Sequence, residues 1–317
     1  MKKRFQKKPL RESEIIDYLK KRYRRTGKEI VCGIGDDAAV LQNGYVVSID
    51  SFFDTVHFDL NYFSMQALGH HVMAASLSDL AAMAAQPVCV LCALSITQDL
   101  SFDDVVQLYR GFEQLSNTYR FDIVGGEVAK STAFGVTITV IGLTRKPLLR
   151  SSAAPGHDLY VTGFLGLAEV GRMVLKEQMP EKEFPDAVQK HRYPEPRIRE
   201  AREIARFCGA CIDTSDGLST DAGHLARESK VKIRIESEHV PIHPEVGRFC
   251  ARKRIDPMEF ILSAGEDFEL LFSAVRTPRL PRIKIFRIGK VLRGKGVYLA
   301  ERGRERGLRT TGYEHTV

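Results

Sequence analysis

The sequence predicts an α/β protein built from two domains. Apolar runs with strand-like spacing alternate with helix-like runs through both halves of the 317-residue chain. A chain of this length can bury a substantial core and most naturally forms two domains of ordinary size. The alternation is interrupted over 146–158, a stretch that carries two prolines, a glycine and paired serines. We therefore expect one domain over 1–146 and a second over 147–317.

The first half has the periodicity of three helices and four strands. Apolar residues share one face of the first predicted helix, and the second is rich in alanine, which allows close packing against a sheet. The predicted helices cover 14–25, 65–85 and 102–120. The predicted strands cover 45–49, 87–97, 121–124 and 135–143. We expect the Gly-Gly-Glu sequence at 125–127 to form a turn between the last two strands.

The second half repeats the alternation. Strands are predicted over 159–162, 210–214 and 231–235, and helices over 167–176, 197–207 and 218–229. The stretch 177–196 is charged and contains prolines, so we expect a surface loop or a lid there. The end of the chain has a mixed pattern.

The composition is that of a soluble globular protein, with 44% hydrophobic and 27% charged residues. No apolar run approaches the roughly 20 residues that a membrane span needs. The basic start lacks the apolar segment of a signal peptide, so we expect a cytoplasmic protein. The net charge of +7 is concentrated in the first 28 positions and in 276–309. We favour a solvated basic surface that attracts anionic nucleotides over a role in binding nucleic acid.

The six cysteines include two C-x-x-C spacings, at 89–92 and 208–211. The first lies in a predicted strand, where residues three apart point to opposite faces and chelate a metal poorly. The second stands alone. We therefore interpret the cysteines as small core residues rather than metal ligands.

Acidic residues recur at glycine-rich or serine-rich points beside apolar runs. These points are Gly33-Ile34-Gly35-Asp36-Asp37, Ser48-Ile49-Asp50, Ser76-Leu77-Ser78-Asp79, Gly125-Gly126-Glu127, Asp213-Thr214-Ser215-Asp216-Gly217 and Gly265-Glu266-Asp267. Charged side chains are seldom buried unpaired, and converging carboxylates repel each other. Their simplest partner is a hard divalent cation, above all Mg²⁺ carrying nucleotide phosphates. The pattern therefore predicts an enzyme that uses Mg-ATP.

Two of these points carry the most information. Asp79 falls inside a predicted helix in apolar company, which is unfavourable unless something coordinates its carboxylate. Asp213, Ser215 and Asp216 precede Gly217 where a strand changes to a helix, so backbone N–H groups and acids are offered together to a metal-bound phosphate. Plain helix capping is the alternative for one of these three residues.

Three further residues are weaker candidates. Glu127 follows two glycines that would let a phosphate pass close to the backbone. Arg150 lies at the predicted domain boundary and has the fork geometry that clamps a phosphate, although an ordinary surface arginine is nearly as good an interpretation. His57 is a lone histidine, which is more often structural than functional.

Several motifs in the same order resemble the thiamine-monophosphate kinase family of the PurM-like superfamily. They are Gly-Ile-Gly-Asp-Asp at 33–37, Val-His-Phe at 56–58, Leu-Ser-Asp-Leu-Ala-Ala-Met at 77–83, Val-Thr-Gly at 161–163, Ser-Asp-Gly-Leu at 215–218, Gly-Glu-Asp-Phe-Glu-Leu at 265–270 and Gly-Tyr-Glu-His at 312–315. The resemblance implies two PurM-like domains of mixed sheets and helices that face each other across an active-site cleft. It further implies a homodimer joined through the N-terminal sheets, a metal and ATP site in the first domain, and ATP-dependent conversion of thiamine monophosphate to the diphosphate.

The resemblance also implies roles for individual residues. The implied Mg²⁺ ligands are Asp36, Ser48, Asp50, Asp79, Glu127, Asp213 and Asp216. The implied ATP-site residues are Gly126, Glu127, Arg150 and Ser215, and those facing the thiamine substrate are His57, Glu266 and Tyr313. Asp50, Arg150 and Asp216 are the expected catalytic residues for direct in-line transfer.

Four positions depart from the family pattern: Glu127 replaces the usual Asp, Ile49 the usual Thr, Ser76 the usual Asn and Ala264 the usual Gly. Two alternatives therefore stay open. One is another ATP-using enzyme of the superfamily. The other is a nucleotide-binding sensor with weak turnover.

Overall fold

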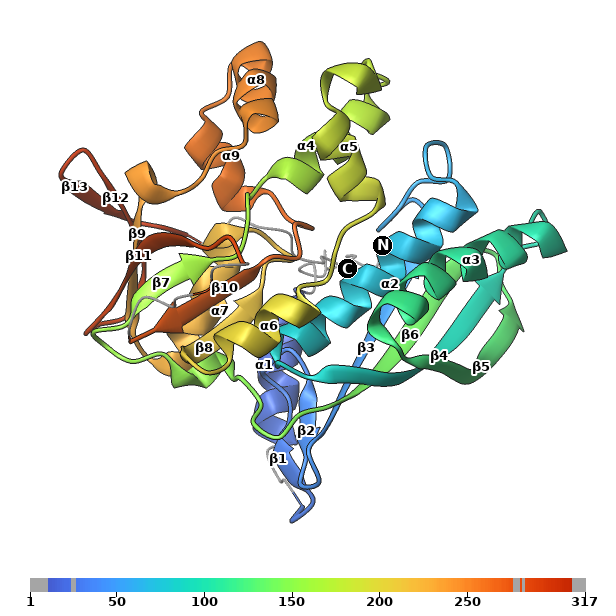
Figure 1. Ribbon diagram of the computed structural model, residues 1–317, viewed down its shortest axis with the longest axis horizontal. Coiled ribbons are helices and arrows are strands. Elements are labelled where there is room, and N and C mark those ends of the chain that lie inside the picture. The colour runs from blue at the N-terminus through green and yellow to red at the C-terminus, as the bar shows by residue number, and fades with distance from the viewer. Residues whose placement is uncertain (1–10, 24–26, 276–279, 281–282, 310–317) are drawn as a thin grey trace, which may run out of the picture.

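A computed structural model describes residues 11–23, 27–275, 280 and 283–309. Two sheets lie at opposite ends of the molecule, and helix α2 (Met65–Ala82) runs between them (Figure 1). The first sheet uses strands between Ile30 and Leu143, and the second uses strands between Asp158 and Gly307. The division into domains at residue 146 stays a prediction.

The first sheet has six strands in the order β1-β2-β3-β6-β4-β5. All neighbours are antiparallel except the parallel pair β4–β5. The strands are β1 (Ile30–Cys32), β2 (Ala39–Leu41), β3 (Tyr45–Phe53), β4 (Gln86–Ile96), β5 (Asp122–Lys130) and β6 (Gly135–Leu143).

Helix α2 is buried on nearly every side, as expected for a helix that is apolar all round. It begins where the Ser64 hydroxyl accepts a hydrogen bond from the backbone N–H of Ala67. It packs on β3, β4 and β6 and also contacts β8 of the second sheet. Helix α3 (Phe102–Tyr119) lies against it, and Gly69 and Gly111 permit the close approach, because a Cβ at either would lie within 2.2 Å of a backbone oxygen of the other helix. One core cluster therefore continues from the first sheet into the second.

The second sheet has seven strands in the order β13-β12-β9-β11-β7-β10-β8. Only β12 and β9 are parallel neighbours. The strands are β7 (Asp158–Val161), β8 (Cys208–Asp213), β9 (Lys232–Glu236), β10 (Leu270–Ala274), β11 (Phe286–Leu292), β12 (Gly296–Glu301) and β13 (Arg304–Gly307). The helices of this half are α4 (Leu167–Lys176), α5 (Pro185–Arg192), α6 (Ile198–Ile204), α7 (Leu218–Ser229), α8 (Pro244–Lys253) and α9 (Pro257–Ser263), and short 3-10 turns occur at Arg150–Ser152, Glu181–Glu183 and Ser237–His239.

Two local expectations are wrong. The sequence 125–127 is not a turn, because β5 continues through both glycines as far as Lys130. The stretch 177–196 is not a surface loop: it contains α5, which buries Ala187, Val188 and His191 and packs on α4.

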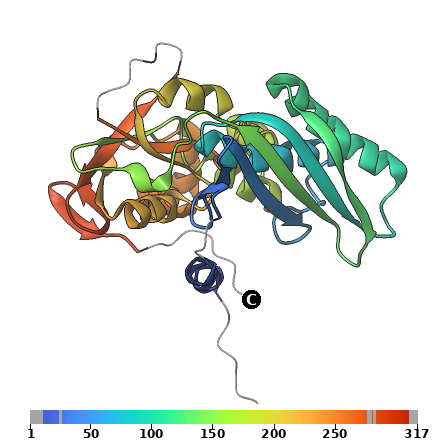
Figure 2. The ribbon, with the colours of Figure 1, turned by 90° about the horizontal axis from the view of Figure 1, so that it is seen from below.

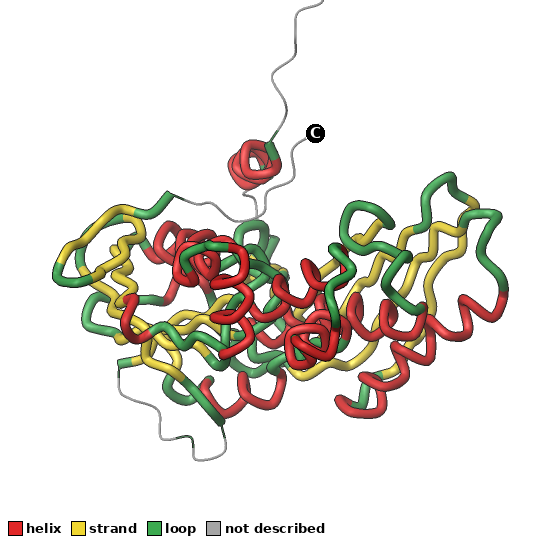
Figure 3. The backbone as a smooth tube through the Cα atoms, turned by 90° about the horizontal axis from the view of Figure 1, so that it is seen from above, coloured by secondary structure: helices red, strands yellow, loops and turns green. Residues whose placement is uncertain are grey.

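Helix α1 (Glu12–Arg22) stands apart from both sheets (Figures 2 and 3) and has no buried residue. Lys20 reaches from it to Glu228 of α7, with 2.5 Å between Nζ and Oε2. Within the described ranges, no helix has both the length and the apolarity that crossing a membrane requires.

Candidate active site

Three carboxylates from separate segments converge between the two sheets. Asp37 precedes β2, Asp79 lies in α2 and Asp213 ends β8, and one oxygen of each lies within 4.8 Å of one oxygen of the others. Asp37 and Asp213 are buried, and Asp79 is half-buried. Because ionised carboxylates at this spacing repel each other, the group needs protons or a cation to be stable.

The pKa values of the acids in and beside this cluster are raised. Burial, and next the charge of Asp37, raises the pKa of Asp213 to about 7. Burial and the neighbouring carboxylates raise the pKa of Asp79 well above its usual range. Burial also raises the pKa of Asp50, which lies in β3 beside the group. Such clustered shifts are typical of functional sites.

The carboxylate cluster fits a bound metal ion. One oxygen of Asp37, Oδ2, is buried and has no hydrogen-bond partner among the described residues. The other, Oδ1, accepts a hydrogen bond from Nη2 of Arg150 at 2.6 Å. The hydroxyl groups of Ser48 and Ser78 donate to Asp79 and Asp213 and so hold these carboxylates in place. A donor set made only of oxygen atoms suits Mg²⁺.

Asp36 and Arg150 join the start of the chain to the segment after the first sheet. The backbone N–H of Arg150 lies 3.3 and 3.2 Å from the two carboxylate oxygens of Asp36. Burial and Asp37 raise the pKa of Asp36 to about 7, while Arg150 acts in the opposite direction. In the structure the Arg150 guanidinium pairs with Asp37. The roles of Asp36 as a metal ligand and of Arg150 as a phosphate clamp stay predictions.

A cleft of about 820 Å³ opens beside the carboxylates. The predicted site residues that line it are Asp50, His57, Asp79, Asp213, Ser215, Asp216 and Glu266. Phe52, Val56 and Phe268 add apolar surface, and Glu169 and Arg172 of α4 add charge. The cleft therefore combines a strongly polar group of acids with apolar surface suited to an organic substrate.

Two tight loops form one wall of the cleft. The backbone N–H of Glu266 donates to the Ser215 carbonyl at 2.9 Å. A Cβ at Gly265 would lie 2.3 Å from that same oxygen, and Gly217 has a left-handed φ of 112°. Only glycine allows this approach, which explains the two glycine-bearing motifs. The loops fix Ser215 and Asp216 just before α7, where the positive end of the helix dipole favours anions.

Comparison with known proteins shows which family this chain belongs to. The family model described as AIR synthase related protein, N-terminal domain, matches residues 35–144. Thiamine-monophosphate kinase of Aquifex aeolicus is 32% identical over 297 residues, which is 92% of this chain and 95% of that protein. The chain belongs to the thiamine-monophosphate kinase family.

Two further comparisons agree with this membership. The Bacillus subtilis thiamine-monophosphate kinase is 33% identical, with 75% of this chain and 76% of that protein covered. The solved structure called AaThiL complexed with AMPPCP and TMP superimposes with a TM-score of 0.89 at 30% identity and covers 96% of this chain and 97% of its own. The PurM-like fold that the motifs implied is thereby confirmed.

Gly126 and Glu127 lie away from the carboxylate cluster of this kinase-family chain. The register across the first sheet runs from Asp50 through β6 and β4 to Gly126. Three strand spacings separate them by roughly 14 Å. Glu127 is exposed on β5 and does not line the cleft. A Cβ at Gly126 would lie 1.7 Å from the Cys92 carbonyl oxygen, so this glycine has a structural reason. The ATP and metal roles of both residues stay predictions.

Two predicted substrate residues, His57 and Tyr313, remain to be placed. Nδ1 of His57 accepts a hydrogen bond from the Phe53 N–H at 3.0 Å, and the ring lines the cleft. Tyr313 lies outside the described residues.

Sequence reasoning did not single out two buried acids, one in the carboxylate cluster and one beside the 213–217 loop. Asp37 belongs to the central cluster, although its neighbour Asp36 was the expected ligand. Asp221 is buried in the first turn of α7 and accepts a hydrogen bond from the Gly217 N–H at 3.0 Å. An acid in the first turn after the 213–217 motif was the available signal for Asp221.

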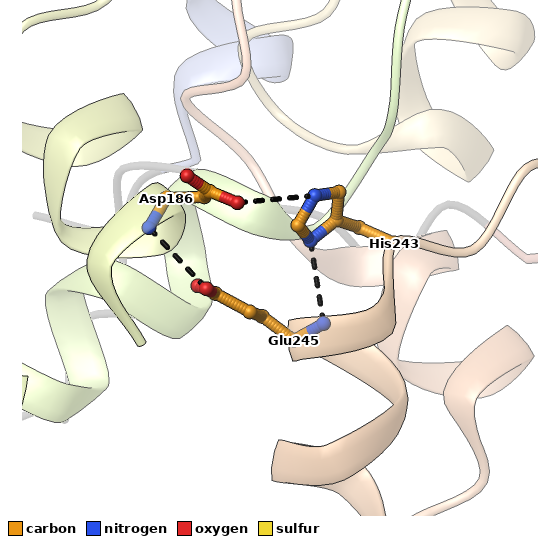
Figure 4. A group of neighbouring side chains, drawn as sticks. All are labelled: Asp186, His243 and Glu245. Atoms are coloured by element: carbon orange, nitrogen blue, oxygen red, sulfur yellow. Dashed lines mark hydrogen bonds and ion pairs between the residues drawn. The ribbon is translucent and has the colours of Figure 1, made fainter. Parts of the chain in front are cut away.

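A second group of possible ligands has a structural explanation. Asp186, His243 and Glu245 lie together where α5 meets α8 (Figure 4). The two oxygens of Glu245 accept hydrogen bonds from the N–H groups of Asp186 and Ala187, at 3.4 and 2.9 Å. His243 accepts from the Glu245 N–H and faces Asp186 at 3.6 Å. Glu245 therefore caps the start of α5.

Proposed function

We propose that this protein transfers the γ-phosphate of ATP directly to the phosphate of thiamine monophosphate and releases thiamine diphosphate and ADP. The carboxylate cluster of Asp37, Asp79 and Asp213, which opens on a cleft with apolar surface, carries the proposal. Because the chain belongs to the thiamine-monophosphate kinase family, thiamine monophosphate is the proposed acceptor. The solved relative whose name includes AMPPCP and TMP supports both substrates.

The metal part of the site is assigned to the clustered acids. Asp37, Asp79 and Asp213 would hold Mg²⁺, and the predicted ligands Asp36, Ser48, Asp50 and Asp216 surround them. Bound Mg²⁺ neutralises the charge of the phosphates and lowers the repulsion between the two reacting anions. Glu127 is proposed as a ligand only through the family pattern.

Groups of the protein itself would bind and orient the two substrates. The start of α7 presents the positive end of its helix dipole to a phosphate, and the interlocked loops at 215–217 and 265–268 keep Ser215 in place. The acceptor oxygen belongs to a phosphate monoester whose second pKa is about 6, so it is largely ionised near neutral pH. No general base is therefore needed. Asp50 and Asp216 are the proposed catalytic carboxylates beside the reacting phosphates, and neither has to transfer a proton.

We further propose that the protein forms a homodimer through the open face of the first sheet. Helices α2 and α3 lie on one side of this sheet, and apolar side chains of β3 and β4 are exposed on the other side. These include Ile49, Phe53 and Leu91. A patch of this kind on a sheet commonly marks a protein interface. The cytoplasmic location expected from the sequence stays a prediction.

The test is to incubate purified protein with Mg-ATP and thiamine monophosphate. The proposal requires ADP and thiamine diphosphate in equal amounts, and no label on the protein when γ-labelled ATP is quenched within one turnover. ATP binding without either product would identify a sensor instead. Labelled protein would contradict direct transfer.

A further inference from the structure

Two buried polar atoms, one of His191 and one of Glu266, face each other behind the cleft without completing a hydrogen bond. Nδ1 of His191 lies 3.5 Å from Oε2 of Glu266. Among the described residues, neither ring nitrogen of His191 has a hydrogen-bond partner. Oε2 of Glu266 has none either. An unpaired buried polar atom is destabilising, so the two groups have reason to pair.

Helix α5 holds His191 firmly at this place. Glu245 caps its first turn (Figure 4), and Lys190 forms an ion pair with Glu269 at 2.6 Å. Arg192 donates to the Tyr62 carbonyl oxygen at 3.1 Å. Three separate segments therefore fix the helix around His191, which is itself only 1% exposed.

Three aromatic rings surround the His191 ring. The rings of Tyr62, Phe63 and His71 lie 5.9, 5.1 and 5.3 Å from it, centroid to centroid. Nδ1 of His71 hydrogen-bonds to the His191 backbone carbonyl at 2.7 Å, so His71 secures the backbone. Glu266 is the charged group that the His191 ring faces.

Glu266 itself is held in a restricted conformation. Its φ of 63° is unusual for a residue other than glycine, and its N–H is bonded to Ser215. It lines the cleft, and Arg172 lies near it. Burial acts to raise its pKa, but His191, His71 and Arg172 together lower the pKa to about 2. Glu266 is thus a carboxylate that stays ionised in contact with the substrate space.

We infer that His191 is a positioning residue for substrate recognition: its Nδ1–H donates to Oε2 of Glu266 and directs the other carboxylate oxygen into the cleft. There this oxygen accepts a hydrogen bond from the amino group on the pyrimidine ring of the acceptor. The inference rests on the proposed function, and it adds a residue from a helix that does not line the cleft. It assigns recognition of the organic part of the acceptor, rather than of ATP, to the pair His191–Glu266.

A double-mutant cycle tests the inference. His191→Leu should raise the KM for thiamine monophosphate about tenfold, the value of one hydrogen bond to a charged group, and leave the KM for ATP within about twofold. His191→Asn should restore most of the affinity, because its amide N–H can replace Nδ1–H. In a Glu266→Gln background, His191→Leu should add little, since it acts through Glu266.

The matched control is His157→Leu, which removes a partly buried histidine bonded to Ser273 outside the cleft lining. It should leave both KM values unchanged. Independent, additive effects of His191→Leu and Glu266→Gln, or equal rises in the KM values for both substrates, would overturn the inference.

Two other outcomes, misfolding of the His191→Leu variant and an inactive wild-type protein, can be told apart from the results above. Should His191→Leu fail to fold, His191→Asn and His191→Gln decide: Asn should keep the acceptor KM, Gln should raise it, and equal values would reject the inference. A wild-type protein that makes no thiamine diphosphate would instead reject the proposed function.

Discussion

Asp50 illustrates how a single carboxylate within a strand acquires a role. It lies on the face of β3 that α2 covers, lines the cleft and neighbours Asp79. Asp50→Asn keeps the shape but removes the charge, so we expect kcat to fall by at least about 100-fold. The Tm should change little. Steady-state kinetics with Asp103→Asn, an exposed acid of α3, as the control measures this. Activity of the Asp50 variant equal to that of the control would contradict its role.

His71 predicts a pH dependence of stability. Burial lowers its pKa from 6.5 to about 4, so the unfolded chain takes up a proton at a higher pH than the folded protein does. The contribution of neutral His71 is present above pH 6.5 and is lost as the pH falls towards 4, by about 3 kcal/mol in all. Urea unfolding of wild type and His71→Gln between pH 7 and 4 should show curves that converge. Parallel curves would contradict the account.

Several of the predicted site residues line the cleft: Asp50 from β3, Asp79 from α2, Asp213 from the end of β8 and Asp216 from the loop before α7. Of two neighbouring acids in the loop between β1 and β2, it is Asp37 and not Asp36 that completes the central cluster. No local pattern reveals such a choice.

At the scale of elements, β5 depends on the absence of a side chain at Gly126. A Cβ there would collide with the Cys92 carbonyl oxygen of β4. Gly126→Ala should therefore destabilise the protein by about 2 kcal/mol or more. Gly247→Ala is the matched control, because nothing lies within 4 Å of its Cβ position in α8. The control should be neutral or stabilising by up to about 1 kcal/mol. Equal unfolding free energies for the two variants would contradict this interpretation.

Helix α5 shows why one element escaped prediction. Its eight residues are mostly polar, and charges and prolines surround it, so the segment looks like a loop. The available signals were Pro185 at the first helical position and the spacing of Ala187, Val188 and His191 on one face. Ion pairs to distant residues stabilise the helix, and sequence periodicity does not record them.

At the scale of the whole molecule, the open face of the first sheet governs assembly. Leu91→Glu places a charge on β4 at a side chain that is 38% exposed on the side of the sheet away from α2, and it should shift the homodimer towards monomer. Ile255→Glu, 39% exposed between α8 and α9, should leave the mass unchanged. Sedimentation velocity of both variants makes the comparison. A Leu91 variant with the mass of a dimer at low micromolar concentration would contradict the proposed interface.

The arrangement of the two sheets around α2 explains why distant motifs form one site. Asp79 lies in the helix that both sheets contact, so acids from β3 and β8 meet around it. Alternating strands and helices predicted this α/β class. The packing of the halves depends on a shared core with long-range contacts, which was inferred only from the resemblance.

The most direct test is a crystal structure with Mn²⁺, a non-hydrolysable ATP analogue and thiamine monophosphate. The account predicts anomalous peaks within coordination distance of Asp37, Asp79 and Asp213, with the terminal phosphate of the nucleotide facing the phosphate of the acceptor. Metal and nucleotide bound elsewhere, with these three carboxylates uncoordinated, would contradict it.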